Sequence, residues 1–257
     1  MTRYILISSG KGGTGKTSTV INLGIALNNF GKDVVVVDGN LTTPNIGLYL
    51  GVPIVPTTLH DVILNKKDIN DSIYLHRSGT KVIPGSISLN SLGKIKSNVL
   101  KKKLREIEKD VDFVIIDCAA GFSHDSLGAL EASDEVLVVT NPELPAVTDA
   151  LKSIKIAEEY GKNVLGIILN RKKGKIEMRP EAIEKLLDKP IISMIPEDIK
   201  IKEALVKQDA VINLFPKSES AIAYKRLAAN LIGEKYYEKP EHEEGFVHKF
   251  MKFFGLK

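Results

Sequence analysis

The sequence is short of several features, and each shortage excludes a class of protein. Its 257 residues include one cysteine and no tryptophan. A single cysteine excludes a disulfide framework and any metal or iron–sulfur site built from several cysteines, so Cys118 is expected to be a small buried residue. No apolar run approaches the roughly 18 residues that span a bilayer. No signal-peptide pattern precedes the glycine-rich loop that begins at Gly10. We therefore expect a soluble, cytoplasmic chain.

A glycine-rich loop follows the apolar residues 4–7. It fits the phosphate-binding pattern G-x-x-x-x-G-K-[ST] and carries an additional lysine, Lys11, at the first variable position. In such a loop, backbone N–H groups surround a polyphosphate, and the positive N-terminus of the next helix faces the same anion. Lys16 is expected to reach the β- and γ-phosphates, and the Thr17 hydroxyl to ligate Mg²⁺. The predicted phosphate-binding residues are Gly10, Lys11, Gly12, Gly13, Thr14, Gly15, Lys16, Thr17 and Ser18.

The rest of the chain alternates between two kinds of pattern. Apolar runs typical of buried strands lie at residues 4–8, 34–38, 82–84, 113–117, 136–140, 164–169 and 191–195. Helical periodicity lies between them, as at residues 18–27, 146–159, 181–187 and 218–231. This alternation predicts a doubly wound, mostly parallel sheet with helices on both faces, the three-layer α/β/α fold of P-loop NTPases. Residues 72–77 and 81–83, with Gly79 between them, predict a hairpin that adds one antiparallel edge strand.

The composition changes near Glu234. We expect residues 1–233 to form the nucleotide-binding domain, because the strand and helix patterns end there. Residues 234–244 are charged and contain a proline, so they read as a linker. Residues 245–257 form a terminal segment of different composition.

Two aspartates end predicted strands close to the loop. Asp117 follows four apolar residues, and the carboxyl end of such a strand is where open α/β folds bind ligands. A carboxylate there holds the water shell of the Mg²⁺ that Thr17 ligates, although a plain core strand with an acidic end is the alternative. Asp38 ends the second strand and is expected beside the loop, orienting the attacking water or binding magnesium indirectly. The alternative for Asp38 and Gly39 is an ordinary turn.

Together these residues resemble the MinD/ParA family of ATPases. Residues 11–18 match the family pattern K-G-G-x-G-K-[TS]-[TS], whose first lysine is its distinguishing mark. The resemblance covers nearly the whole chain, is closest to the MinD branch, and continues through residues 38–51, 112–121, 140–143, 169–171 and 195–198. It implies an ATPase that uses ATP and Mg²⁺. The catalytic residues would be Lys11, Lys16, Asp38 and Asp117, and the metal-binding residues Thr17, Asp38 and Asp117.

By the same resemblance, Lys11 crosses a dimer interface to the phosphates of the partner subunit, so that ATP held between two subunits drives dimerisation. Asn170 and residues 195–197 are implied to contact adenine. The residues implied to bind the nucleotide on this side of the loop are Asn170, Arg171, Ile195, Pro196, Glu197 and Asp198. No segment resembles the N-K-x-D sequence of a guanine site, which favours ATP over GTP. Asn40 stands where the family often has an acid, so hydrolysis is expected to be slow or to rest on Asp38 and an activating partner. Asp149 is either a partner-facing acid or a solvated helix charge.

The terminal segment has an amphipathic pattern. Four of the eight phenylalanines lie in residues 245–257. On a helical wheel the apolar side chains occupy an arc of about 160°, and the basic residues lie opposite. That pattern is typical of a helix lying in a membrane interface, whereas the alternative is a helix docked on the protein's own core or on a partner. The residues expected at the membrane are Phe246, Val247, Lys249, Phe250, Met251, Lys252, Phe253 and Phe254.

Two functions remain open from the sequence. The first is a MinD-like ATPase that dimerises on ATP, binds an anionic membrane surface in that state and acts in spatial positioning at a division site or cell pole. The second is a ParA-like DNA-segregation ATPase. A net charge of +4 does not by itself indicate nucleic acid. The basic residues that would support DNA binding are Lys94, Lys96, Lys101, Lys102, Lys103, Arg105, Arg171, Lys172, Lys173 and Lys175. Basic runs are more often solvated surfaces, and few aromatic residues accompany these, so we expect no DNA binding. A metabolic ligase or kinase on this fold would not need the aromatic tail.

Overall fold

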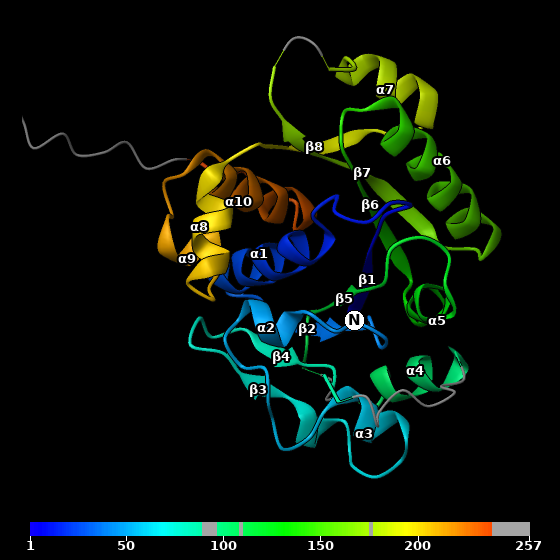
Figure 1. Ribbon diagram of the computed structural model, residues 1–257, viewed down its shortest axis with the longest axis vertical. Coiled ribbons are helices and arrows are strands. Elements are labelled where there is room, and N and C mark those ends of the chain that lie inside the picture. Colours follow the sequence, from blue (N-terminus) through cyan, green and yellow to red (C-terminus); the bar gives the residue numbers. More distant parts are fainter. Residues whose placement is uncertain (89–96, 108–109, 175–176, 238–257) are drawn as a thin grey trace, which may run out of the picture.

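The computed structural model describes residues 1–88, 97–107, 110–174 and 177–237, which form an eight-stranded sheet between layers of helices (Figure 1). The strand order is β3-β4-β2-β5-β1-β6-β7-β8, and every pairing is parallel except β3 with β4. The strands are β1 (Arg3–Ser8), β2 (Val34–Asp38), β3 (Tyr74–Leu75), β4 (Lys81–Ile83), β5 (Phe113–Asp117), β6 (Glu135–Thr140), β7 (Asn163–Lys172) and β8 (Ile191–Pro196). The predicted doubly wound sheet and its antiparallel edge strand are confirmed.

The central strands are apolar throughout because both faces of the sheet are covered. In β1, Tyr4 and Leu6 join one hydrophobic cluster, while Ile5 and Ile7 join the other. Successive side chains of a strand point to opposite faces, so a short apolar run supplies both cores at once. The described residues therefore have two cores, one on each side of the sheet.

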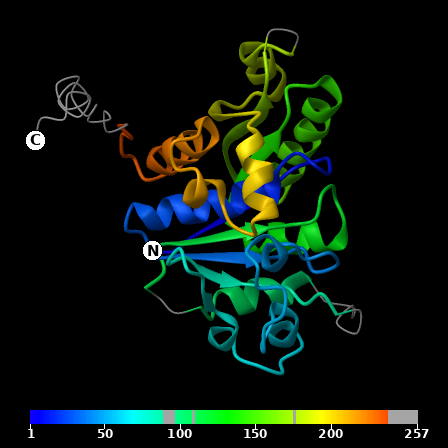
Figure 2. The ribbon, with the colours of Figure 1, turned by 60° about the vertical axis from the view of Figure 1, so that its left-hand side comes forward.

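The helices divide between these two faces (Figures 1 and 2). One core is covered by α1 (Lys16–Asn29), α2 (Ile46–Tyr49), α8 (Ile199–Val206), α9 (Val211–Leu214) and α10 (Glu219–Leu231). The other is covered by α3 (Leu59–Ile63), α4 (Ser97–Leu104), α5 (His124–Ala132), α6 (Leu144–Glu159) and α7 (Pro180–Leu187). Both layers flank the end of β1, so the loop that follows it lies between them.

Element limits differ from the predicted ones for local reasons. The β3 strand has only two residues, because a 3₁₀ turn, η1 (Asn70–Ser72), occupies the start of the predicted 72–77 strand. The β4 strand ends at Ile83, since the next residue, a proline, has no N–H for the ladder. The β7 strand extends to Lys172, beyond the predicted residue 169, and carries Asn170 within it.

The end of the described chain lies beside α1. Tyr236 packs edge-on against Phe30, with ring centroids 6.4 Å apart. The predicted linker 234–244 lies outside the described residues from 238 onward, as does the whole terminal segment 245–257. Among the helices of the described residues, none has the length and apolar character needed to cross a membrane.

Candidate functional site

The glycine-rich loop runs from the end of β1 into α1, as the sequence predicts. Gly13 and Gly15 have φ angles of 77° and 99°, a region that residues with a side chain rarely occupy. Gly15 also meets a neighbour: a Cβ on it would lie 2.1 Å from Nδ2 of Asn170. Gly10 is equally restricted, since its Cβ would lie 2.2 Å from the carbonyl oxygen of Asp149 on α6. The loop is therefore shaped by its own glycines and by contacts from β7 and α6.

The two lysines of the loop are placed in opposite ways. Lys16 is only 8% exposed, and its Nζ donates a hydrogen bond to Oγ of Ser9 at 2.9 Å. Lys11 is exposed, and its side chain has no hydrogen bond or ion pair within the part of the chain that the structure describes. Lys16 thus contacts its own loop, whereas the charge of Lys11 is free to interact with a ligand or another protein.

Asp38 and Asp117 stand side by side at the carboxyl ends of β2 and β5, where the register pairs them directly. Thr17 donates its hydroxyl to Oδ2 of Asp117 at 2.6 Å, so the start of α1 is tied to this acid. Oδ2 of Asp38 accepts hydrogen bonds from the backbone N–H groups of Asn45 and Ile46, at 2.8 and 2.9 Å. Oδ1 of Asp38 is buried and has no partner among the described residues.

Burial governs the protonation of this pair. Removal from water, together with the charge of Asp117, raises the pKa of Asp38 to about 8. Burial also raises the pKa of Asp117 to about 6, although the Thr17 hydroxyl and the Lys16 charge act in the opposite direction. Because the two carboxyls are neighbours, they titrate as a pair. A bound cation would stabilise the charged forms of both carboxyl groups. The Oδ1 atom of Asp38, which has no partner among the described residues, is suited to bind such a cation.

Replacing Asp38 with asparagine is expected to stabilise the nucleotide-free protein more at pH 8 than at pH 5. A carboxyl whose pKa is raised by folding supports the native state fully only below its ordinary, unfolded-state pKa, and that contribution is lost progressively as pH rises from there to the folded-state value of about 8. An amide stays neutral and its oxygen still accepts from Asn45 and Ile46. We expect a gain at pH 8 of at least about 1.4 kcal/mol, the equivalent of one pKa unit, visible as a higher Tm in calorimetry.

The matched control is Asp71→Asn, which removes an exposed carboxylate. It should leave Tm unchanged at both pH values. A Tm change for Asp38→Asn that is the same at pH 5 and pH 8 would contradict the pKa assignment.

A hollow of about 330 Å³ opens over the loop. Its lining residues are Gly12, Gly13, Gly15, Lys16, Thr17, Ser18, Asn40, Thr43, Asn45, Tyr49, Cys118, Ala119, Ala120 and Arg171. Asn40 does not point freely into it, because its Nδ2 donates to the carbonyl oxygen of Thr43 at 2.6 Å and its Oδ1 accepts from the Thr43 N–H. Thr43, Asn45 and Tyr49 were not predicted, since no motif singles them out. Cys118 is buried, as expected, but it also borders this hollow.

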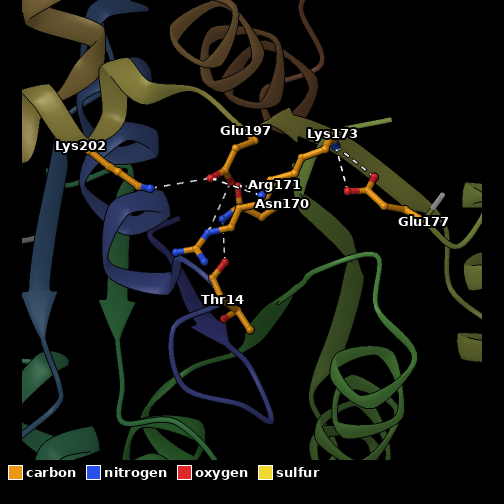
Figure 3. A network of polar contacts seen from close by, with 7 residues as sticks. All are labelled: Thr14, Asn170, Arg171, Lys173, Glu177, Glu197 and Lys202. Atoms are coloured by element: carbon orange, nitrogen blue, oxygen red, sulfur yellow. Dashed lines mark hydrogen bonds and ion pairs between the residues drawn. The ribbon is translucent and has the colours of Figure 1, made fainter. Parts of the chain in front are cut away.

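A second hollow adjoins the first on the side of β7 and β8. It is lined by Gly15, Ser18, Asn170, Arg171, Pro196, Glu197, Asp198, Ile201, Lys202 and Tyr224. Asn170 reaches across to the loop, where its Nδ2 donates to the carbonyl oxygen of Thr14 at 2.6 Å (Figure 3). Five of the six residues predicted to bind the nucleotide on this side therefore border one hollow. The side chain of the sixth, Ile195, is 0% exposed and packs in the core.

Three basic side chains lie around Glu197 at the rim of this second hollow (Figure 3). Its carboxylate lies 3.8 Å from Arg171, 3.9 Å from Lys202 and 4.0 Å from Lys173. Arg171 has a left-handed backbone with φ 57° and borders both hollows. Arg171 therefore places a positive charge where the base-side hollow meets the phosphate side.

The residues present suit a magnesium–nucleotide complex. Magnesium uses one or two protein oxygens and completes its shell with water and phosphate oxygens. Thr17, Asp117 and the free oxygen of Asp38 supply such donors, and Lys16 is at hand for phosphate charge. Within the described ranges, no group of three His, Cys, Asp or Glu side chains forms a closed metal site. The fold and the loop together define a P-loop nucleoside triphosphatase.

Comparisons with known proteins narrow this class. The family described as the AAA domain matches residues 2–167. An uncharacterised ATP-binding protein of Methanocaldococcus jannaschii is 39% identical over 98% of this chain and 97% of its own. The septum site-determining protein MinD of Pyrococcus horikoshii, solved with Mg-ADP, is 36% identical with a TM-score of 0.86, covering 90% of this chain and 96% of that one.

A MinC:MinD cell division protein complex from Aquifex aeolicus also matches, at 27% identity and a TM-score of 0.82 over 92% of this chain and 98% of that one. The chain belongs to the MinD/ParA family of ATPases and is similar to MinD. It is an ATPase, and its cofactors are ATP and Mg²⁺.

Proposed function

We propose that this chain is an ATP-controlled positioning protein that dimerises around ATP and then binds a membrane surface. The observation that carries the proposal is that Lys11 is exposed and its side chain has no partner among the residues that the structure describes. A lysine costs side-chain entropy to order and has no use within its own loop, where Lys16 already serves the phosphates. At the edge of the phosphate hollow it is suited to the phosphates of a second subunit. The γ-phosphate would then complete a charge pair between two copies.

Within each subunit, the proposed chemistry divides among a few side chains. Lys16 exchanges its contact with Ser9 for the β- and γ-phosphate oxygens and neutralises charge that develops during transfer. Thr17 and Asp117 would hold magnesium, which would supply polarisation of the γ-phosphoryl group. Asp38 stays in place through Asn45 and Ile46, and once ionised its second oxygen would accept a hydrogen bond from the attacking water. Asn170 and the segment 196–198 contact the base.

Hydrolysis in an isolated subunit is expected to be slow. Asn40 carries no charge, and both ends of its amide are occupied by Thr43. A residue held in that turn does not take a proton from water. An activating protein partner that reshapes residues 40–45 would raise the rate, and the likeness to a MinC:MinD complex makes a protein partner reasonable.

The membrane half of the proposal rests on the sequence of residues 245–257. A short basic helix binds an anionic surface weakly, at about 1 kcal/mol for each lysine near the surface. Two such helices on one dimer bind with an avidity that exceeds either affinity by about 10²- to 10⁴-fold. Membrane residence would therefore follow the nucleotide state.

Co-sedimentation with vesicles of equal parts phosphatidylglycerol and phosphatidylcholine tests this function. The full chain with ATP is expected to pellet at least about tenfold more than with ADP, given that avidity. A chain ending at Glu244 should remain in the supernatant while still dimerising with ATP. Vesicles of phosphatidylcholine alone serve as the control for charge. Equal pelleting of both chains in every nucleotide state would refute the membrane switch.

The DNA-binding alternative has weaker support. Lys94, Lys96 and Lys175 lie outside the described residues. Several of the remaining basic residues have acidic neighbours: Lys103 pairs with Glu106, Arg105 with Asp134, Lys172 with Glu177, and Lys173 with Glu197. A phosphate backbone is bound through free positive charge, which these pairs reduce.

A further inference from the structure

A hollow away from the nucleotide site lies at the edge strand β3. It is a hollow of about 330 Å³ between the residues that follow α2, the β3–β4 turn and the end of α8. Leu50, Val52 and Leu75 contribute apolar surface, and Arg77 and Lys207 contribute positive charge. Leu75 is 73% exposed, unusual for a leucine on a strand. We call this hollow the β3 groove.

The described chain ends beside the end of α1, which also contacts the β3–β4 turn. Tyr236 packs against Phe30, which follows α1. Two residues earlier, Asn28 donates from Nδ2 to the carbonyl oxygen of Ser78 at 3.2 Å. The Ser78 hydroxyl lies 2.9 Å from Nδ1 of His76, and His76 lines the groove. The end of α1 therefore lies between the last described residues and the β3–β4 turn that forms part of the groove wall.

The chain that follows Tyr237 has the matching chemistry. Residues 238–244 contain four glutamates and one lysine, Lys239, and the three glutamates at 241, 243 and 244 come shortly before Phe246. Acid followed by a large aromatic complements positive charge beside an apolar hollow. Residues 241–246 reach roughly 13 to 30 Å beyond Tyr237 when extended. The acidic charge of residues 241–244 therefore suits the basic side chains of the β3 groove.

We propose that residues 241–246 dock in the β3 groove of the nucleotide-free monomer. The glutamates lie against Arg77 and Lys207, and Phe246 enters between Leu50, Val52 and Leu75. Arg77 keeps its 2.6 Å ion pair with Asp209, since its side chain is 63% exposed and has room for a second partner. The consequence for membranes rests on the proposed function: a docked Phe246 is withheld from the lipid surface.

The contact need not be strong to matter. A short linker gives an effective concentration in the millimolar range, so a docking constant of about 1 mM leaves about half of the tails docked. Anionic lipid presented to two tails of an ATP-bound dimer competes with this easily. The groove therefore holds part of the tails in the monomer, whereas in a dimer at a membrane the lipid surface displaces them.

The absence of tryptophan allows a direct test of docking without lipid or nucleotide. Phe246→Trp in the full chain places one tryptophan in the protein. We expect blue-shifted emission and an acrylamide quenching constant about twofold lower than in the same chain carrying Leu75→Asp, as half-occupancy implies. Lys207→Glu, a second exposed substitution, should also raise quenching. Leu186→Asp, at an exposed leucine on α7, is the matched control and should change nothing.

The outcomes separate the alternatives. Quenching equal to that of free tryptophan, and unaltered by Leu75→Asp and Lys207→Glu, would overturn the docking. A blue shift that grows with protein concentration would also overturn it, because a second copy would then be the occupant. Reversing the tail charges with Glu241→Lys, Glu243→Lys and Glu244→Lys should undock Phe246→Trp, and Lys207→Glu should restore part of the effect. Since no membrane is present, failure here leaves the vesicle experiment unaffected.

Discussion

Replacing Lys11 with alanine is expected to leave the protein monomeric in the presence of ATP while it still binds the nucleotide. Lys11 is exposed, and its side chain has no partner among the described residues, so its removal costs the subunit little. If it pairs with the phosphates of a second subunit, its loss removes a desolvated charge contact from the dimer. Such truncations cost about 2–5 kcal/mol, so the dimerisation constant should weaken by about 30-fold or more. Sedimentation velocity with ATP or a slowly hydrolysed analogue measures this.

The matched substitution is Lys16→Ala in the same loop. Lys16 is buried against Ser9 and faces its own site, so its loss is expected to abolish tight nucleotide binding and lower turnover by about 10²- to 10³-fold. Lys11→Ala should retain ADP affinity, and Lys16→Ala should lose it. A Lys11→Ala dimer of normal strength would refute the cross-subunit role, whatever Lys16→Ala does.

Replacing Gly15 with alanine is expected to weaken binding of Mg-ADP by at least about tenfold, a loss of 1.4 kcal/mol. Two costs combine at this position. The φ of 99° is unfavourable for any residue with a Cβ, and the new atom would lie 2.1 Å from Nδ2 of Asn170. Asn170 would have to leave the Thr14 carbonyl, which distorts the loop and the base-side hollow together. Titration calorimetry with Mg-ADP gives the affinity.

Gly13→Ala separates the two costs. Gly13 also has a positive φ, 77°, but no atom lies within 4 Å of where its Cβ would be. It carries the backbone strain of Gly15→Ala without the collision, so it should weaken binding clearly less. Equal losses in the two variants would mean that the Asn170 contact does not shape the nucleotide site.

Local patterns were enough for much of the fold. Strands such as Val34–Asp38 and Phe113–Asp117 are short and wholly apolar until their final acid, because each is buried on both faces. A buried strand must be apolar wherever it lies in the sheet, so its existence is visible without its neighbours. The loop at Gly10 is equally local: its glycines, Lys16 and the start of α1 lie within one stretch of chain.

Side-by-side placement was not visible in this way. Asp38 was expected beside the loop, yet β2 pairs with β5, and β5 pairs with β1, so Asp117 lies between. Asn170 reaches Thr14 only because β7 extends past its predicted end. Ile195 was predicted to contact the base and is buried, whereas Pro196 borders the hollow. In a strand, adjacent residues face opposite sides, so a segment's role does not say which of its members is exposed.

By itself, the sequence determined the class of fold, the phosphate loop with its two lysines and the family to which the chain belongs. Those properties follow from residue types at fixed spacings along a continuous chain. Only the tertiary structure decided that Lys16 is buried and Lys11 exposed, and that Asp38 and Asp117 are buried side by side with raised pKa values. It also decided that the end of α1 contacts both Tyr236 and the β3–β4 turn. Burial and charge coupling depend on which strands and loops become neighbours, and packing of the two helical layers on the sheet sets that arrangement.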